Sequence, residues 1–115
     1  MSLRLSVVIP VYRSQSTLRE LCRRLVAALE PIDPSFEIIL VEDCGGDDSW
    51  TVIQEMAEDD RRIRGIQLSR NFGQHAATIC GFAEAKGEWI ATLDDDLEQA
   101  PESLPDLYHK AHEGH

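Results

Sequence analysis

Four short apolar segments, each followed by a stretch with helical periodicity, constrain the fold of this chain more than any other feature. The segments cover residues 5–9, 36–41, 63–68 and 89–93, and they are rich in valine, isoleucine and leucine. Near-continuous apolar runs of this length are typical of strands that are buried on both faces. Strands that alternate with helices form a parallel sheet covered on both sides. We therefore predict an α/β fold with a mostly parallel, doubly wound sheet and helices on both faces.

The stretches between these segments have the spacing of amphipathic helices. The first helix opens with Thr17, three residues before Glu20, which is the pattern of a capping box. The third helix is predicted to run to Gly87, where glycine suits a left-handed C-cap, and Pro101 begins a last helix. A chain of 115 residues is long enough for one core, so residues 1–115 are expected to form a single domain.

Three consecutive aspartates follow the last predicted strand. Asp94, Asp96 and Glu98 alternate along the chain, so in an extended segment they point to one side while Asp95 points away. Carboxylate oxygens on one side suit Mg²⁺ or Mn²⁺, which keeps waters and phosphate oxygens as its other ligands. Taken alone, this segment is equally compatible with a solvated acidic turn that holds no metal.

Polar side chains follow each of the four predicted strands. In parallel α/β sheets, ligands bind beyond the carboxyl ends of the strands, near a topological switch point. The segments expected to gather there are residues 10–13, 42–43, 70–71 and 94–96. Asp43 is either a simple turn residue or an acceptor for a nucleotide base, and Arg70 is either a solvated residue or a bidentate ligand of a diphosphate.

The composition excludes several kinds of partner. The chain carries 21 acidic and 11 basic residues, a formal net charge of −10, which argues against nucleic acid and against unaided docking on an anionic membrane. The sequence has neither the glycine pattern of a Rossmann dinucleotide site nor that of a P-loop. Its three cysteines lack CxxC spacing, which indicates reduced thiols of a cytosolic protein.

These motifs together resemble those of the family 2 glycosyltransferases of GT-A fold. The resemblance rests on residues 7–12, on residues 41–43, and on residues 94–96 as a DxD motif. Residues 68–75 and 96–102 are similar to the polyprenyl-phosphate branch of the family, which includes enzymes like dolichol-phosphate mannose synthase. The resemblance covers essentially the whole chain.

The resemblance implies a site for a UDP- or GDP-sugar and a Mg²⁺ or Mn²⁺ cofactor. The residues implied in nucleotide-sugar binding are Pro10, Val11, Tyr12, Ser14, Glu42, Asp43, Arg70, Asp94, Asp95 and Asp96. The implied metal ligands are Asp94, Asp96 and Glu98, and Asp96 is the implied catalytic residue. Asp95 is expected to act mainly through its backbone. This sequence departs from the family pattern at four places. A carboxylate is usual at the position of Ser14, and Gly-Ser-x is common where this chain has residues 44–46. A small residue is usual at the position of Asp95, and glutamine is common at that of Glu98.

The implied reaction is inverting sugar transfer, in which the metal stabilises charge on the departing diphosphate. The expected acceptor is a polyprenyl phosphate, bound by a C-terminal half that residues 1–115 lack, so this chain alone is expected to bind nucleotide without turnover. The full-length protein is expected at the cytoplasmic face of the membrane, in the synthesis of cell-envelope polysaccharides. Transfer to a saccharide hydroxyl, a non-catalytic nucleotide-binding scaffold and a sugar-1-phosphate nucleotidyltransferase are the alternatives.

Overall fold

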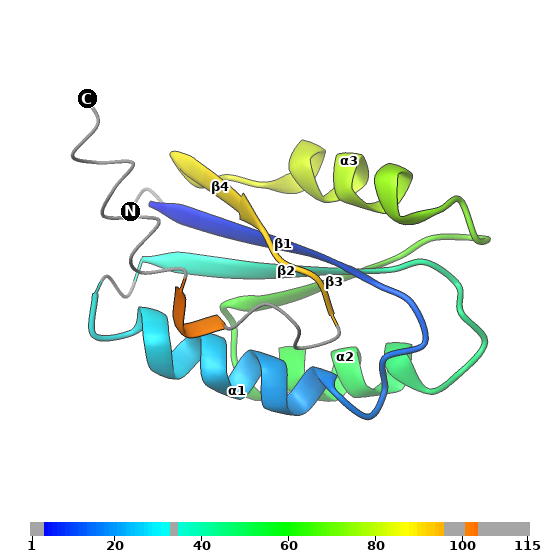
Figure 1. Ribbon diagram of the computed structural model, residues 1–115, viewed down its shortest axis with the longest axis horizontal. Helices are drawn as coiled ribbons and strands as arrows, with labels where there is room; N and C mark the ends of the chain where they lie inside the picture. Colours follow the sequence, from blue (N-terminus) through cyan, green and yellow to red (C-terminus); the bar gives the residue numbers. More distant parts are fainter. Residues whose placement is uncertain (1–3, 33–34, 96–100, 104–115) are drawn as a thin grey trace.

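The computed structural model describes residues 4–32, 35–95 and 101–103, and in these residues strands and helices alternate along the chain (Figure 1). The elements are β1 (Leu5–Val11), α1 (Leu18–Leu29), β2 (Phe36–Glu42), α2 (Ser49–Asp59), β3 (Ile63–Gln67), α3 (Gln74–Glu84), β4 (Trp89–Thr92) and η1 (Pro101–Ser103). All three strand pairs are parallel. The predicted α/β fold with a parallel sheet is therefore confirmed. Of the predicted last helix, only the short 3-10 turn η1 lies within the described residues.

The strand order places the switch point of the sheet between β1 and β4. The order is β3-β2-β1-β4, so the chain first builds outward from β1 and then crosses back to add β4 on the other side. The register pairs Val8 with Thr92, the last residue of β4, whereas β1 continues to Val11. The final residues of β1 therefore extend past the end of β4 at the carboxyl edge of the sheet.

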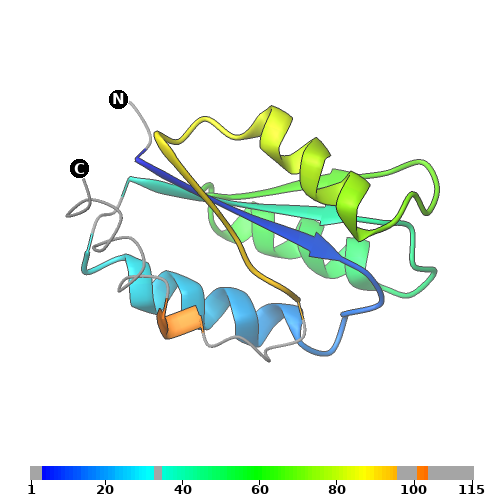
Figure 2. The ribbon, with the colours of Figure 1, turned by 45° about the horizontal axis from the view of Figure 1, so that its top comes forward.

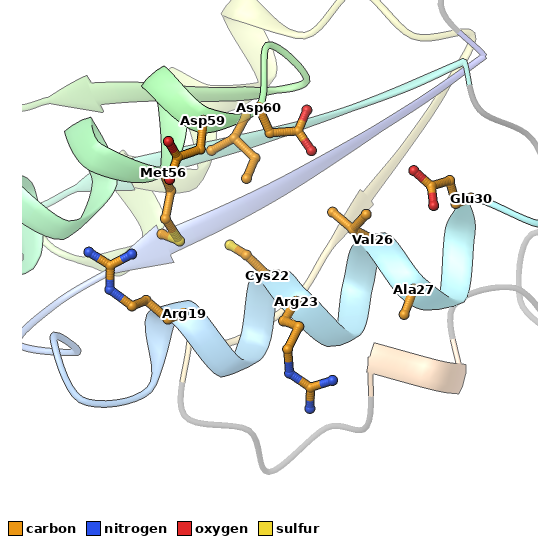
Figure 3. Close-up of a pocket in the computed structure, with 10 residues that line it drawn as sticks. Arg19, Cys22, Arg23, Val26, Ala27, Glu30, Met56, Asp59 and Asp60 are labelled. Carbon is orange, nitrogen blue, oxygen red and sulfur yellow. The ribbon is translucent and has the colours of Figure 1, made fainter.

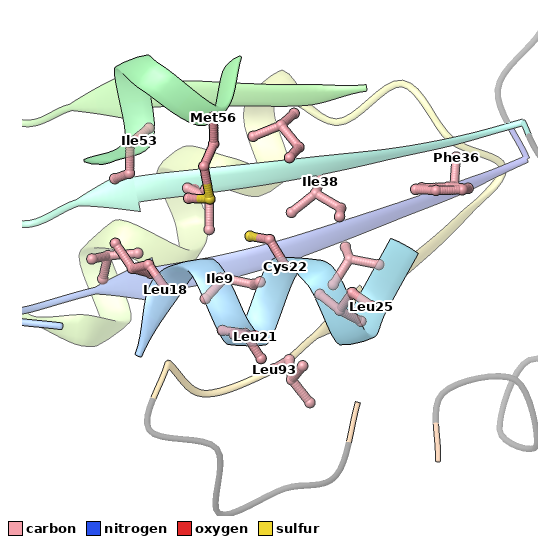
Figure 4. Packing of buried hydrophobic residues seen from close by; sticks show 14 of the residues in the cluster. Ile9, Leu18, Leu21, Cys22, Leu25, Phe36, Ile38, Ile53, Met56 and Leu93 are labelled. Atoms are coloured by element: carbon pink, nitrogen blue, oxygen red, sulfur yellow. The ribbon is translucent and has the colours of Figure 1, made fainter. Parts of the chain in front are cut away.

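Helices cover both faces of the sheet, but unequally. Helices α1 and α2 lie on one face and α3 lies on the other, as Figures 1 and 2 show. The larger core fills the space between α1, α2 and the sheet, where Leu21, Leu25 and Ile38 are fully buried (Figure 4). Strands β1 and β2 are buried along their whole length, whereas β3 and β4 alternate between more and less buried side chains. The two central strands thus provide a rigid base for the loops that follow them.

Helix α3 packs closely on the sheet because a glycine faces it. A Cβ atom at Gly81 would lie 2.3 Å from Cγ1 of Val8 and 3.2 Å from Cγ2 of Val41. We expect Gly81→Ala to lower the free energy of unfolding by about 1–3 kcal/mol in urea denaturation. In an unhindered helix the same change stabilises by about 0.5–1 kcal/mol, so the sign of the effect is diagnostic. Ala83→Val, at an exposed position of the same helix, is the control and should cost less than about 1 kcal/mol.

The expectation for Gly87 is wrong, and the reason is close packing. Helix α3 ends at Glu84 rather than Gly87, and Gly87 does not have a left-handed backbone. Glycine is required there because a Cβ atom would lie 2.6 Å from the backbone nitrogen of Ser6. Strand β1 is longer than the predicted segment 5–9 and continues through Pro10 to Val11. The sheet tolerates the proline because its missing N–H faces the side where β4 has already ended.

The predicted capping box at the start of α1 does not form. Thr17 occupies the N-cap position, but its hydroxyl makes no cap hydrogen bond and donates to the backbone oxygens of Ser14 and Asp95. Glu20 pairs with Arg23 one turn further along. The Thr17 hydroxyl therefore ties α1 to the segment after β4.

No helix within the described residues is long and apolar enough to cross a bilayer.

Candidate functional site: the pocket at the strand ends

Loops at the carboxyl edge of the sheet enclose two adjoining cavities. The smaller, of about 50 Å³, is lined by Pro10, Val11, Tyr12, Asp43, Gln74 and Asp95. The larger, of about 260 Å³, is lined by Tyr12, Asp43, Asn71, Gly73 and Gln74. We call the two together the strand-end pocket. Each of the four segments predicted to gather at this edge contributes a residue, so their predicted gathering is confirmed.

Asp43 connects the end of β2 to the loop that precedes α3. Its side chain is buried, and its two carboxylate oxygens accept hydrogen bonds from the backbone N–H groups of Phe72 (2.8 Å) and Gly73 (2.9 Å). Its own N–H donates to the carbonyl of Val11 at 2.9 Å. Two N–H donors on one carboxylate form a charge-assisted pair that holds the loop in place. Asp43 therefore shapes both cavities, in addition to its predicted contact with a base.

Asp95 connects the end of β4 to the loop that follows β1. Its Oδ2 accepts hydrogen bonds from the N–H of Tyr12 at 2.8 Å and from the hydroxyl of Ser14. Its backbone oxygen accepts from the hydroxyl of Thr17 at 2.7 Å. The expectation that Asp95 points away and acts mainly through its backbone is wrong. Strand β4 ends at Thr92, so the alternation of an extended strand does not continue into the aspartates.

The predicted metal ligands lie only partly within the described residues. Asp94 is half-buried, and its Oδ1 accepts a hydrogen bond from the side-chain amide of Gln74 at 3.0 Å. Asp96 and Glu98 lie outside the described residues. Among the residues that are described, no three His, Cys, Asp or Glu side chains form a group that could hold a metal ion. Carboxylate oxygens are hard ligands of the kind that Mg²⁺ and Mn²⁺ prefer. Because two of the three predicted ligands lie outside the described residues, the metal site stays a prediction.

Three further predicted binding residues, Glu42, Arg70 and Ser14, do not line the pocket. Glu42 is buried, and its carboxylate accepts from the N–H of Gly45 at 2.8 Å, which supports the turn after β2. Arg70 is exposed, and its guanidinium lies 4.8 Å from the centre of the Phe72 ring. Their predicted roles in binding remain predictions. Ser14 is buried one step behind the pocket, where its N–H donates to the hydroxyl of Ser49 at 2.9 Å.

Sequence reasoning gave no role to Gln74, although it is central to the site. It is the first residue of α3, lines both cavities and bonds to Asp94. Its place follows from Gly73, whose positive φ of 98° turns the chain into the helix. The available signals were its place in residues 68–75, which resemble the polyprenyl-phosphate branch, and its position just after a glycine at a predicted helix start. Neither signal indicates which way the side chain turns.

A larger cavity of about 390 Å³ lies between α1 and α2, away from the strand ends (Figure 3). Its base contains Cys22 and Met56, which belong to the hydrophobic core. Burial raises the pKa of the Cys22 thiol to about 12, so it is protonated and unreactive at neutral pH. The charged residues at the rim include Arg19 and Arg23, which pair with Glu55 and Glu20. We therefore place the functional site at the strand ends, despite the smaller volume there.

Comparison with solved structures defines the class of the protein. Staphylococcus aureus TarS in complex with UDP-GlcNAc has the same fold, with a TM-score of 0.78, 25% identity and coverage of 96% of this chain and 32% of that one. The mannosyltransferase PcManGT from Pyrobaculum calidifontis, solved with GDP-Man and Mn²⁺, matches 91% of this chain and 31% of its own with a TM-score of 0.73. At 18% identity, this second likeness concerns the fold alone. The chain is an α/β domain of the GT-A type.

The family follows from the sequence. Residues 6–115 match glycosyl transferase family 2, and the chain belongs to this family. The undecaprenyl-phosphate 4-deoxy-4-formamido-L-arabinose transferase of Pseudomonas syringae is 45% identical over 111 residues, which are 96% of this chain and 33% of the relative. The enzyme of the same description from Sodalis glossinidius is 46% identical over 105 residues, 90% of this chain and 32% of the relative. The chain thus spans about a third of the length of these relatives.

Proposed function

We propose that this chain is the donor-binding part of an inverting, metal-dependent glycosyltransferase that moves a sugar from a nucleoside diphosphate to a polyprenyl phosphate. The observation that carries the proposal is the strand-end pocket, which lies at the switch point of a family 2 domain and is lined by Asp43 and Asp95. The relatives that are 45% and 46% identical are named as transferases to undecaprenyl phosphate, which supports the proposed acceptor. We further propose that the full-length enzyme works at the cytoplasmic face of a membrane, because a polyprenyl phosphate is a membrane lipid.

In this proposal the described residues bind and orient the nucleotide. Pro10, Val11 and Tyr12 form the wall against the base and ribose, because they line the pocket and Tyr12 exposes its ring. Asp43 lines both cavities, and its carboxylate can accept a hydrogen bond from an N–H group of the nucleotide base. Gln74 adds an amide next to Asp94, where the diphosphate would approach the aspartates.

The diphosphate needs a cation in this pocket. The chain has a net charge of −10, and two carboxylates line the smaller cavity, so an uncompensated anion is repelled. Asp94, Asp96 and Glu98 would hold Mg²⁺ or Mn²⁺, which supplies charge neutralisation on the departing diphosphate when bound. A phosphate acceptor has a second pKa of about 6, so it is largely ionised at neutral pH and needs little help from a general base.

Calorimetry on the 115-residue chain tests the donor half of the proposal. We expect UDP or GDP to bind in the presence of Mn²⁺ and to bind much more weakly without it. At a hundredfold excess of nucleotide over Kd, binding should raise the apparent free energy of unfolding by about 2.7 kcal/mol. If neither nucleotide binds with Mn²⁺ present, the proposed donor site is wrong.

Matched variants separate a metal site from a general charge effect. Asp94→Asn should weaken the Mn²⁺-dependent binding, whereas Asp59→Asn, an exposed position on α2 with the same charge change, should leave it unchanged. In the full-length enzyme, Asp96→Asn should abolish transfer. Normal transfer by that variant would favour a role for this domain in binding only.

A further inference from the structure

The loop between β1 and α1 is held at three points by one residue from the far end of the chain. One carboxylate oxygen of Asp95 accepts hydrogen bonds from the N–H of Tyr12 and the hydroxyl of Ser14. The backbone carbonyl of Asp95 accepts a third from the hydroxyl of Thr17. Tyr12 and Asp95 are 83 residues apart in sequence. The loop and the aspartate segment therefore meet only because β4 pairs with β1.

The Asp95 carboxylate supplies the hydrogen-bond acceptor that a longer β4 would otherwise offer to β1. Val8 is the last residue of β1 that lies opposite β4, and the N–H of Tyr12 faces the same side, beyond the end of β4. A backbone N–H that leaves a sheet needs another acceptor. The Asp95 carboxylate supplies it at 2.8 Å. The next residue, Arg13, has a positive φ of 54°, which a non-glycine residue adopts only where its surroundings enforce it.

The other side of this loop is also anchored. The N–H of Ser14 donates to the buried hydroxyl of Ser49, and the Nε of Arg13 donates to the carbonyl of Gly45 at 2.9 Å. The loop thus lies between a fixed support at the start of α2 and the carboxylate of Asp95. Removing Asp95 leaves that support in place but frees the side of the loop that faces the pocket.

We propose that Asp95 is a positioning residue that preforms the wall of the strand-end pocket and joins that wall to the neighbouring Asp94. Because Val11 and Tyr12 line the pocket, the position of this loop sets the shape that a base and ribose would meet. Because Asp95 follows Asp94 directly, the same contact sets where the aspartate segment stands relative to that wall. The inference deepens the proposed function and rests on it.

The Ser14–Asp95 contact offers a test by exchange. Asp95→Ala removes the acceptor, Ser14→Asp places two carboxylates together, and Ser14→Asp with Asp95→Ser restores one hydroxyl and one carboxylate in reversed positions. If Asp95 positions the loop, each single variant should weaken binding of Mn²⁺ with UDP or GDP by ~10-fold or more, as the loss of a charge-assisted hydrogen bond would. The exchanged double variant should recover affinity to within ~3-fold of the parent chain. Ser14→Ala, a milder change, should weaken binding by ~3-fold.

A second measurement does not depend on nucleotide. The amide hydrogen of Tyr12 should exchange with solvent ~10-fold faster in the Asp95→Ala chain, and the exchanged variant should restore its protection. Unchanged exchange at Tyr12 would overturn the positioning role. A double variant that is folded and protects Tyr12, but does not recover binding, would also overturn it and show that Asp95 contacts the ligand itself. If the parent chain binds no nucleotide, the proposed function fails, and the exchange of Tyr12 still decides whether Asp95 holds the loop.

Discussion

Asp43→Ala is expected to weaken nucleotide binding by about 100-fold, the largest loss of affinity for any single change in the described part of the pocket. The carboxylate holds the N–H groups of Phe72 and Gly73, and the loop that carries them lines the larger cavity. A hydrogen bond to a charged group contributes about 1.5–3 kcal/mol, and each 1.4 kcal/mol is a factor of ten in affinity. Because Phe72 is 48% exposed and water can replace part of the loss, we take the lower end for both bonds. Calorimetry with Mn²⁺ and UDP or GDP measures the change.

Two variants define what the loss of Asp43 means. Asp43→Asn keeps one acceptor oxygen but turns an NH₂ group toward the second N–H donor, so its binding should fall between the parent and Asp43→Ala. Asp59→Ala removes an exposed carboxylate from α2 and should bind like the parent. If Asp43→Ala binds nucleotide as tightly as the parent while remaining folded, the strand-end pocket is not the nucleotide site.

The position of the site could be predicted because parallel topology alone brings it together. Strands β1 and β2 are buried on both faces, so they appear in the sequence as continuous apolar runs whose ends are clearly marked. Once the strands are parallel, Tyr12, Asp43 and Asp95 must lie at one edge. This inference needs only the order of the segments and no side-chain geometry.

Side-chain directions beyond the strand ends could not be predicted, because they depend on where pairing stops. The alternation that pointed Asp95 away assumes an extended strand, and β4 ends three residues earlier at Thr92. The sequence also does not show that Ser14 and Asp95, two of the positions where it departs from the family pattern, lie next to each other. In the structure the hydroxyl of Ser14 donates a hydrogen bond to the carboxylate of Asp95.

A buried charged residue, Glu37, lies near the amino end of β2, within a run that is otherwise mostly apolar. Glu37 is only 3% exposed, and its carboxylate accepts from the hydroxyl of Ser6 (2.6 Å), the N–H of Lys86 (2.8 Å) and the guanidinium of Arg64 (2.8 Å). The Ser6 hydroxyl in turn accepts from the N–H of Gly87 at 2.8 Å. This network fixes the turn between α3 and β4, and therefore the strand that delivers the aspartates.

Glu37→Ala is expected to lower the free energy of unfolding by about 2–4 kcal/mol at neutral pH. Removing one partner of a buried ion pair costs about 3–5 kcal/mol, and we lower this range because the Arg64 side chain is 33% exposed and also contacts Glu84. Glu37→Gln keeps an acceptor but adds an NH₂ group among donors, so its loss should be smaller. Urea denaturation at pH 7 measures both changes.

The contribution of the Glu37 carboxylate to stability can be measured from how the free energy of unfolding depends on pH in acid. Burial alone would raise the pKa of Glu37, but the hydrogen bonds from Ser6, Lys86 and Arg64 outweigh it and hold the pKa below its ordinary value of 4.5. The carboxylate therefore stabilises the fold fully above about pH 4.5, and this stabilisation is lost as the pH falls through the lower pKa of the folded state. The Glu37→Gln variant has no carboxylate at this position and therefore lacks this pH-dependent stabilisation. The free energies of unfolding of the variant and the parent should converge as the pH falls below 4.5.

A difference measurement is required because several other carboxyl groups also have lowered pKa values. The hydrogen bond from Arg62 lowers the pKa of Asp60, and hydrogen bonds from Ser49 and Gln15 lower that of Asp47 in spite of burial. These groups are shared by the parent and the variant, so they cancel when the two stability curves are subtracted. Glu58→Gln, at an exposed position on α2, is the matched control and should run parallel to the parent. If the Glu37→Gln curve also runs parallel to the parent between pH 7 and pH 3, the network does not hold an ionised carboxylate.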